Sequence, residues 1–533
     1  MVGWKRANVW CYLLAEPQVF VRRASGLVRN LNAWDVLWYN LLWMAPMAVT
    51  VYGIWAEQLF PGTDLPLTAL LSIPMSLIVG IFYAMFSAAM PRSGGDYVWV
   101  SRLLHPVLGF MGIFFVWVGI LGIAGSYVPW FTQWAISPIL LFTGNSAAAA
   151  LISNVNFNFV LAIIIYILFA LLMSRGSKIT MLFLSALGVI ILVAWVVFVG
   201  TMLTTPLAVF RANFNAYSGM NYDQVIAHAQ SLGIPLTPVA SATALGVVLT
   251  YFNFIGFNSS VYMAGEIKNV QRNQLLGIVV AILIFGLVDW LVYYAANVGM
   301  GSSFIIAMAN LQGRGDPMYT LSFAPYLHFL FQYTTRNPYV FGLVCFGWGM
   351  MTIGAILTYV FFSVRFIFAA SFDRVLPSVL SKVDPNYNTP TTALIATTII
   401  AIVMQVLWSY TPLLNYFVYD ILGTMILQAF AAIAGIIFVY RRKDMFETSP
   451  SLTRMKIGSV PVMVILGVAT LLLSIWLGWA SVAPAYVGSI NPAYLGLELA
   501  IYIIGAAVYV TSWAYHKNKG IPLSLVFKQL PPE

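Results

Sequence analysis

Residues 250–273 read TYFNFIGFNSSVYMAGEIKNVQRN, an apolar segment of membrane length that runs into a charged end. Gly256 and Asn258 lie near its middle, and both residue types are poor helix formers. A backbone that opens within a bilayer exposes amides and carbonyls that hydrocarbon cannot satisfy, so it persists only where protein or water supplies partners. The stretch therefore predicts a helix that is interrupted at mid-membrane, which is a candidate site for a small molecule.

The whole chain has the composition of an integral membrane protein. Of its 533 residues, 61% are hydrophobic and 8% are charged, whereas about a quarter of the residues of a globular domain are charged. The mean hydropathy is +0.89. A helix needs about 20 residues to cross a hydrocarbon core of about 30 Å. We expect an all-α fold with twelve transmembrane helices, near 33–58, 66–90, 107–136, 156–174, 179–202, 241–264, 274–299, 338–368, 391–409, 412–440, 460–482 and 494–515.

Basic residues predict the orientation of these spans, because Lys and Arg stay on the cytoplasmic side. With the N-terminus inside, only Arg211, Arg314 and Arg336 of the 25 Lys and Arg residues fall on the outer face. We therefore expect a multi-pass protein of the cell (plasma) membrane with both termini in the cytoplasm. This asymmetry and attraction to anionic headgroups of the lipid bilayer account for the net charge of +9, so no nucleic acid partner is expected.

The first span also carries a sequence that favours a break. It contains LLWMAPMAVTVYG, with Pro46 near its middle. The first helix of spans 1–5 and the first helix of spans 6–10 thus both carry a sequence that favours a break. Because each unit has five helices, an odd number, the second unit enters the membrane from the side opposite to the first. We expect a 5+5 inverted-repeat core over 33–440, with helices 1 and 6 interrupted, and two appended helices in 441–516. Residues 1–32 and 517–533 are expected to be cytoplasmic segments.

Four motifs follow one another along the chain: GLVRNLNAWDVL, PRSGGDYVWVSRLLHPVLGF, IGFNSSVYMAGEIKNVQRN and FDRVLPSVLSKVDPNYNTP. Together, over residues 30–440, they resemble the amino acid permeases of the amino acid-polyamine-organocation superfamily. The resemblance implies alternating access and secondary active transport of an amino acid or a related small amine, by symport or exchange.

The two breaks predict where a substrate binds. If span 6 stops near Ile255, the carbonyls of residues 252–255 lose their amide partners and form a cup for an ammonium group. If span 1 restarts at Pro46, the free amides of Met47 and Ala48 form a cup for a carboxylate. The resemblance places substrate contacts at the same two breaks. The predicted substrate-binding residues are Trp43, Met44, Ala45, Met47, Ala48, Phe252, Asn253, Phe254, Ile255, Gly256, Asn258 and Trp348.

The chain departs from the resembled family at three places. Members commonly carry a Gly-Ser-Gly-like run in span 1, where residues 43–46 of this chain read WMAP and narrow the approach. Cationic amino acid transporters often carry Asp at the position of Asn258, which weakens a polyamine or arginine assignment. Some proton-coupled members carry a Lys in span 5, where this chain has Ser185.

Charged and hydroxyl side chains supply candidates for coupling and gating. A carboxylate within a span costs at least about 2.5 kcal/mol, so Asp289 is expected to carry a proton or to pair with a substrate amine. The alternative for Asp289 is a protonated carboxyl bonded to a neighbouring Tyr or Asn. Sodium held by span-1 carbonyls and a hydroxyl such as Thr352 is a second way of coupling. The complete predicted set is Asp289, Asp96, Arg102, Glu266, Asp420, Ser185 and Thr352, in which Asp96 can pair with Arg102 and Glu266 either closes the inner end or is a solvated helix terminus.

Two other classes of function fit the sequence less well. A membrane enzyme would need clustered acids, His or Cys, whereas the four His and sixteen acidic residues are scattered over separate loops. A substrate-sensing receptor on a transporter scaffold would usually carry a long signalling extension. The sequence therefore predicts a transporter of a small molecule, not an enzyme, with no metal or cofactor. Coupling to H+ or Na+ and the oligomeric state stay open.

Overall fold

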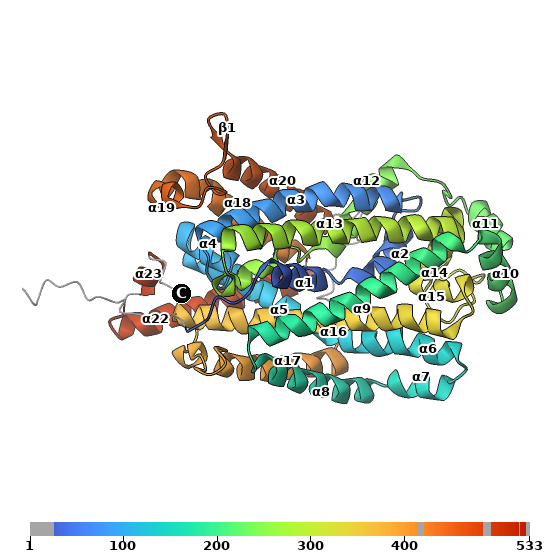
Figure 1. Ribbon diagram of the computed structural model, residues 1–533, viewed down its shortest axis with the longest axis horizontal. Helices are drawn as coiled ribbons and strands as arrows, with labels where there is room; N and C mark the ends of the chain where they lie inside the picture. The colour runs from blue at the N-terminus through green and yellow to red at the C-terminus, as the bar shows by residue number, and fades with distance from the viewer. Residues whose placement is uncertain (1–25, 413–420, 483–491, 522, 529–533) are drawn as a thin grey trace, which may run out of the picture.

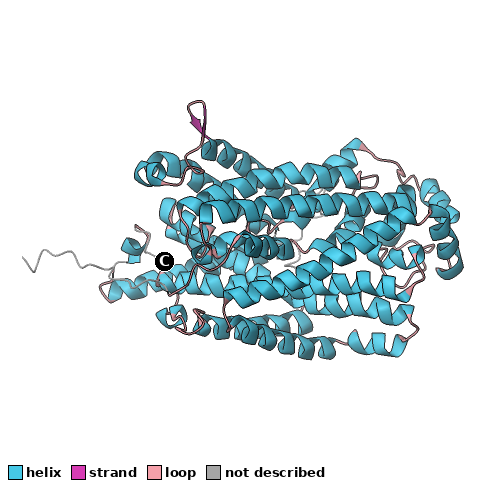
Figure 2. Cartoon of the chain, in the orientation of Figure 1, coloured by secondary structure: helices cyan, strands magenta, loops and turns pink. Residues whose placement is uncertain are grey.

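The computed structural model describes residues 26–412, 421–482, 492–521 and 523–528. Helices make up nearly all of the regular structure in these ranges, apart from one short pair of strands (Figure 2). Eleven helical segments in the same ranges are long and apolar enough to cross a membrane. The protein is therefore an all-helical, multi-pass membrane protein, as its composition predicts.

The bounds of these elements follow the predicted spans closely. The helices at the centre of the eleven segments are α3 (Leu65–Ala89), α5 (Pro106–Trp130), α8 (Val155–Met173), α9 (Ser177–Thr204), α12 (Ala240–Phe254), α13 (Val270–Ala296), α16 (Pro338–Phe372), α17 (Thr391–Tyr410), α18 (Ile421–Arg441), α20 (Val462–Ala480) and α22 (Pro492–Asn518). Shorter elements are α4 (Asp96–Leu103), α6 (Ser137–Phe142), α7 (Ser146–Ile152), α10 (Leu207–Tyr217), α11 (Tyr222–Ser231), α14 (Ser302–Gly313), α15 (Leu327–Thr334), α19 (Lys443–Thr448), α23 (Leu523–Val526), η6 (Ser378–Ser381) and the antiparallel hairpin of β1 (Lys456–Ile457) and β2 (Val460–Pro461).

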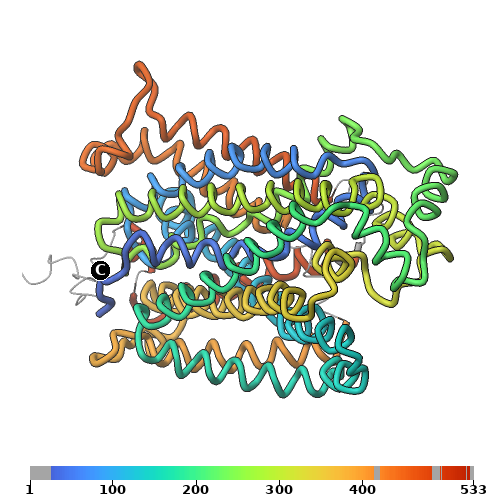
Figure 3. Tube along the Cα trace, turned by 45° about the vertical axis from the view of Figure 1, so that its right-hand side comes forward, coloured from blue at the N-terminus to red at the C-terminus, as the bar shows by residue number. Residues whose placement is uncertain are grey.

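The first predicted span consists of two helices, α1 (Ala33–Trp43) and α2 (Val49–Leu59), and neither alone is long enough to cross. Between them Ala45 adopts the left-handed conformation, with φ of 51°, and η1 (Pro46–Ala48) makes a single 3-10 turn. Asn32 begins α1 with a reciprocal cap to Asp35. In Figure 3 the dark-blue α1 runs between α13 and α16, against which it packs.

The sixth span is also interrupted where the sequence predicts. Helix α12 ends at Phe254, and Gly256 then takes a φ of 110°, a conformation that side chains other than glycine rarely adopt. Two 3-10 turns follow, η3 (Ser259–Tyr262) and η4 (Ala264–Glu266), before α13 begins. Both interruptions expected from the sequence are thus present.

Two spans extend beyond their predicted ends through a π-helical turn. Helix α5 continues through η2 (Phe131–Ile136) into α6, and α13 continues through η5 (Asn297–Gly301) into α14. The predicted span ends at residue 299, so a loop is expected from about residue 300. The apolar run that follows Gly301 instead stays helical, because it packs against α2 and α11.

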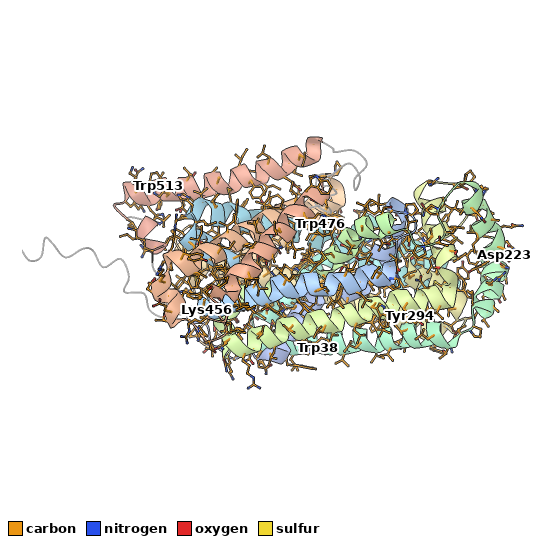
Figure 4. The ribbon with its side chains drawn as sticks, turned by 90° about the horizontal axis from the view of Figure 1, so that it is seen from above. Trp38, Asp223, Tyr294, Lys456, Trp476 and Trp513 are labelled. Atoms are coloured by element: carbon orange, nitrogen blue, oxygen red, sulfur yellow. The ribbon has the colours of Figure 1, made fainter. Side chains whose placement is uncertain are left out.

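The connections after α9 and α13 gather at one end of the molecule. Figure 1 shows α10, α11, α14 and α15 at this end, which we call the loop end, where α11 packs against α14 and α10 against α15. Figure 4 shows Asp223 of α11 at the loop end, with Lys456 and Trp513 toward the opposite end, which we call the tail end. Large apolar side chains stay exposed along the bundle's sides, such as Val196 of α9, whose exposed fraction is 72%, as expected of a surface that faces lipid.

Candidate functional site

The two breaks meet at a cavity of about 130 Å³, which we call the outer cavity. Its walls come from α1, η1 and α2 on one side, α12 on another, and α5, η2, α16 and α18 on the rest. Eight of the twelve predicted substrate residues line it: Trp43, Met44, Ala45, Ala48, Phe252, Asn253, Ile255 and Trp348.

The other four predicted substrate residues lie elsewhere. Gly256 and Asn258 line a second cavity of about 60 Å³, which we call the inner cavity. Met47 is buried, and its carbonyl accepts a hydrogen bond from the Thr50 hydroxyl at 2.9 Å. Phe254 is buried against Phe285, with ring centroids 4.7 Å apart. These last two side chains pack the protein and lie outside both cavities.

The backbone cups expected at the breaks are only partly free. The amide of Ala48 donates to the carbonyl of Ala45 at 2.9 Å, so the prediction that this amide is free is wrong. The carbonyls of Phe252 and Phe254 accept bonds from the amides of Ile255 and Phe257 at 3.1 and 3.2 Å. The breaks close into 3-10 turns and β-turns, which satisfy groups that an abrupt helix end would leave open.

Aromatic side chains dominate the outer cavity, and nine of them line it. The rings of Trp130 and Trp134 stack 4.8 Å apart where α5 passes into the π-turn η2, and Trp134 meets Trp348 edge to face at 5.3 Å. The Tyr127 ring lies 4.9 Å from the Trp130 ring, and the hydroxyls of Tyr127 and Tyr359 lie 3.1 Å apart. Sequence reasoning identified Trp43, Phe252 and Trp348 but missed the members from α2, α5, η2 and the middle of α16, namely Tyr52, Trp55, Tyr127, Trp130, Trp134 and Tyr359. The stacked pair is spaced i, i+4, a pattern that could have indicated a shared helix face.

Two hydrogen-bond donors on residues of this cavity have no partner. They are the Nδ2 of Asn253 and the Nε1 of Trp348, and both atoms are buried. A buried donor without a partner costs about 1–3 kcal/mol, so each favours a ligand with an acceptor group. Among the described lining residues the polar side chains are otherwise tyrosines, Thr424 and indoles, and none is charged.

A histidine at the loop end, His328, connects the aromatic lining of the outer cavity with the break in span 1. It is not among the residues predicted from the sequence. Nδ1 of His328, on α15, lies 2.7 Å from the Thr50 hydroxyl. The same hydroxyl donates to the carbonyl of Met47 at 2.9 Å. The His328 ring stacks on Trp348 at 5.3 Å. Burial lowers the pKa of His328 to about 3, so the ring is neutral.

The tail end of the bundle is closed by buried ion pairs. Arg365 of α16 binds Glu266 of η4 with 2.8 and 3.0 Å bonds, and the exposed fraction of each side chain is 2%. The Ser177 hydroxyl, at the start of α9, bonds to both. Amides of Asn30 and Leu31 donate to the carbonyl of Glu266 at 3.0 Å. Of the two readings left open for Glu266, the solvated terminus is therefore wrong.

The pairing expected between Asp96 and Arg102 is also wrong. Arg102 binds Asp373, at the end of α16, with two bonds of 2.9 Å. Asp96 instead accepts bonds from the Tyr83 hydroxyl at 3.3 Å and the Tyr97 amide at 3.1 Å. The two residues are six positions apart on α4, which turns their side chains to different faces of the helix.

The remaining coupling candidates stay predictions. Asp289 is buried on α13 and lines neither cavity, and the hydroxyl of Tyr293, one turn further along the helix, interacts with its carboxyl. The hydroxyls of Ser185 and Thr352 bond to carbonyls of their own helices, at 2.8 and 2.7 Å. Asp420 lies outside the described residues. Within the described ranges, no three His, Cys, Asp or Glu side chains are grouped so that they could hold a metal ion.

Comparisons with known proteins agree with this architecture. The amino acid permease family matches residues 38–510. A branched-chain amino acid permease of Bacillus subtilis (strain 168) is 25% identical over 475 residues, which cover 86% of this chain and 90% of that protein. A methylthioribose transporter of the same organism is 23% identical over 375 residues, covering 69% and 72%. An uncharacterized protein of Sulfolobus islandicus rod-shaped virus 1 is 22% identical over 370 residues, covering 68% and 70%.

The family match spans most of the chain, including both breaks and both cavities. It accounts for the many apolar helices. The chain is a membrane transporter rather than an enzyme, and it belongs to the amino acid permease family.

Proposed function

We propose that this permease is a secondary active transporter that moves an amino acid or a related small amine across the cell membrane by alternating access. The observation that carries the proposal is the outer cavity, which lies where two interrupted helices meet. Interrupted helices that face each other at mid-membrane are the usual substrate site of transporters built from inverted repeats.

The proposed architecture is a 5+5 inverted repeat over 33–440, with two appended helices in 441–516. The segments 1–32 and 517–533 would then lie in the cytoplasm, on the side of the tail end. Under this orientation, the closed end of the bundle faces the cytoplasm. The loop end, with α10, α11, α14 and α15, faces outward.

The cavity's chemistry supports a ligand with both a cationic and an acceptor group. Faces of indole and phenol rings attract an ammonium group, with about 0.5–2 kcal/mol for each good contact. The unpartnered donors of Asn253 and Trp348 fit a carboxylate or another acceptor. One relative is named for branched-chain amino acids and another for methylthioribose, which carries no ammonium group, so both kinds of solute belong in the test of this proposal.

Coupling to H+ through Asp289 and coupling to Na+ with Thr352 are the two symport mechanisms that we propose to distinguish, with exchange as the third. Purified protein in liposomes should be tested with leucine, valine, lysine, isopentylamine and methylthioribose under separate proton and sodium gradients. We expect at least one amino acid or amine to accumulate above empty liposomes, driven by one gradient.

A variant links this flux to the outer cavity. Asn253→Ala removes an unpartnered donor, and we expect apparent affinity to fall by up to about tenfold, which is the effect of one hydrogen bond. Asn518→Ala, at the exposed end of α22, is the matched control and should behave as the native protein. If no solute of the panel accumulates or exchanges, the proposed transport function is wrong. If only methylthioribose moves, the amine assignment is wrong.

A further inference from the structure

The inner cavity lies between the outer cavity and the closed tail end. Four residues line both cavities, and Trp43 and Ile255 are two of them. The indole of Trp43 fills the opening in span 6, because a Cβ placed on Gly256 would lie 1.8 Å from its Cδ1. Trp43 therefore forms the partition between the two cavities, and a shift of its side chain would join them.

The chemistry of the inner cavity differs from that of the outer one. Asp96, Asn258 and Gln428 line it, together with three tyrosines. The Asp96 side chain has an exposed fraction of 3%. Its hydrogen bonds come from the Tyr83 hydroxyl and a backbone amide, and Tyr262 also stabilises the ionised form. Within the described ranges, therefore, a buried carboxylate faces this cavity without a cationic partner.

A second group in the same cavity has no partner. The hydroxyl of Tyr251, on α12, is buried and forms no hydrogen bond. Because the residue lines the inner cavity beside Asp96, the two groups share one small space. A volume of about 60 Å³ exceeds the minimum of about 15 Å³ for one water, so the cavity has room for a solvated or substrate-borne ammonium group.

The cationic partners that could neutralise Asp96 are held elsewhere. Arg102, on the same helix, is committed to Asp373. Arg365 is committed to Glu266, deeper in the closed end. A buried carboxylate is stabilised by a cation that donates hydrogen bonds to it, and a primary ammonium supplies both.

We propose that the inner cavity is a second binding site on the transport path, where the ammonium group of the substrate pairs with Asp96 after passing Trp43 and before release at the tail end. The site takes amines and amino acids and excludes their deaminated analogues. This inference rests on the proposed function, because it requires that the substrate carry an ammonium group.

The experiment separates binding from passage, using purified full-length protein. Equilibrium binding of labelled leucine and isopentylamine is measured in detergent, and counterflow of both is measured in liposomes. Asp96→Asn keeps the shape of the side chain and removes its charge, while one of the two accepting oxygens becomes a donor amide. We expect binding constants to stay within about twofold of native, since the outer cavity is intact, and counterflow to fall by more than tenfold.

Two further variants guard against a folding defect. Tyr251→Phe removes only an unpartnered hydroxyl. We expect counterflow to fall twofold to fivefold with unchanged binding, because the substrate loses at most one hydrogen bond in the inner cavity. Glu447→Gln, an exposed carboxylate on α19, is the control and should match the native protein.

The outcomes separate the two proposals. If the native protein exchanges neither probe, the proposed function is wrong for amines. If the native protein exchanges them and Asp96→Asn does so at the native rate, the inner site is wrong while the function stands. If Asp96→Asn abolishes binding as well as counterflow, while Tyr251→Phe leaves both unchanged, Asp96 supports the fold and the inner site is overturned.

Discussion

The break in span 1 lasts five residues, Met44 to Ala48, before the helix resumes, whereas span 6 has no α-helix from residue 255 to residue 269. The short break is held by bonds to residues close in the sequence, such as the Ala48 amide to the Ala45 carbonyl and the Thr50 hydroxyl to the Met47 carbonyl. The long break forms turns of its own and in addition takes side-chain partners from neighbouring helices. Asn40 of α1 and Gln274 of α13 both bond to Ser260, at 3.0 and 2.8 Å.

This difference teaches that an interruption needs either a local turn or external hydrogen bonds. Proline with one left-handed residue rebuilds a helix at once. A glycine followed by Asn and Ser builds turns that other helices must hold. The span-6 break should therefore be more sensitive to substitutions in its surroundings than the span-1 break.

The largest effect is expected at the far end of the long break, where Arg365 holds Glu266. Arg365→Ala leaves a buried carboxylate without its cation, which costs about 3–5 kcal/mol. We expect a marked fall of the melting temperature in detergent and loss of transport. Arg442→Ala removes an exposed pair with Asp444 and should change neither measurement. An unchanged melting temperature for Arg365→Ala would show that the pair does not hold the long break.

Gly256→Ala should come next, because it strains the backbone and meets Trp43 at 1.8 Å. We expect transport to fall more than tenfold, since the indole must leave the partition between the cavities. Gly200→Ala, on α9, meets nothing within 4 Å and is the control. Native flux in the Gly256 variant would contradict the close contact on which the partition depends.

Removing the external partner of the long break tests the comparison directly. Asn40→Ala deletes two hydrogen bonds to Ser260, from Nδ2 at 3.0 Å and to Oδ1 at 2.8 Å. We expect a loss of about 1–3 kcal/mol, measured by denaturant unfolding, because buried partners are left unsatisfied. Asn518→Ala serves again as the control. Equal stability of Asn40→Ala and the control would mean that the long break holds itself.

The pH dependence of transport tests the charge beside the long break. Burial raises the pKa of Asp96 to about 7, although bonds from Tyr262 and Tyr83 lower it. The titratable groups that face Asp96 are tyrosines, which stay neutral at this pH, so the carboxyl gains its charge as pH rises through about 7. Counterflow of isopentylamine should rise several-fold over this range. Asp96→Asn should remove the rise, and a rise that persists in this variant assigns the titration to another group.

The proton on Asp96 also links pH to stability. Because the folded-state pKa is above the ordinary value, the folded protein binds this proton more tightly than the unfolded chain. The stabilisation is present at low pH and is lost as pH rises toward about 7.

The smallest effect is expected in the short break. Ala45 has a φ of 51°, so Ala45→Gly relieves a left-handed residue while adding freedom to the unfolded chain. We expect a gain of at most about 1 kcal/mol and near-native flux. A loss of transport in this variant would show that the short break depends on the Ala45 side chain.

The breaks themselves could be predicted because Gly256, Asn258 and Pro46 carry local backbone preferences. The partners of the predicted residues could not, since Glu266 and Arg365 are 99 positions apart and no local pattern joins them. The π-turn η2, which presents Trp130 and Trp134 to the outer cavity, has no simple periodic signal. Single sequences therefore indicate where a helix opens more readily than what lines the opening.

The Asn40–Ser260–Gln274 hydrogen bonds have a mechanical consequence. They join the first half of span 1, the turns of span 6 and the start of α13, so these three segments are expected to move as one unit. A tilt of α1 would then move residues 259–266 as well. Ala45 and Gly256, which both have a positive φ, lie where this unit meets α2 and α12, and we expect them to act as its two hinges.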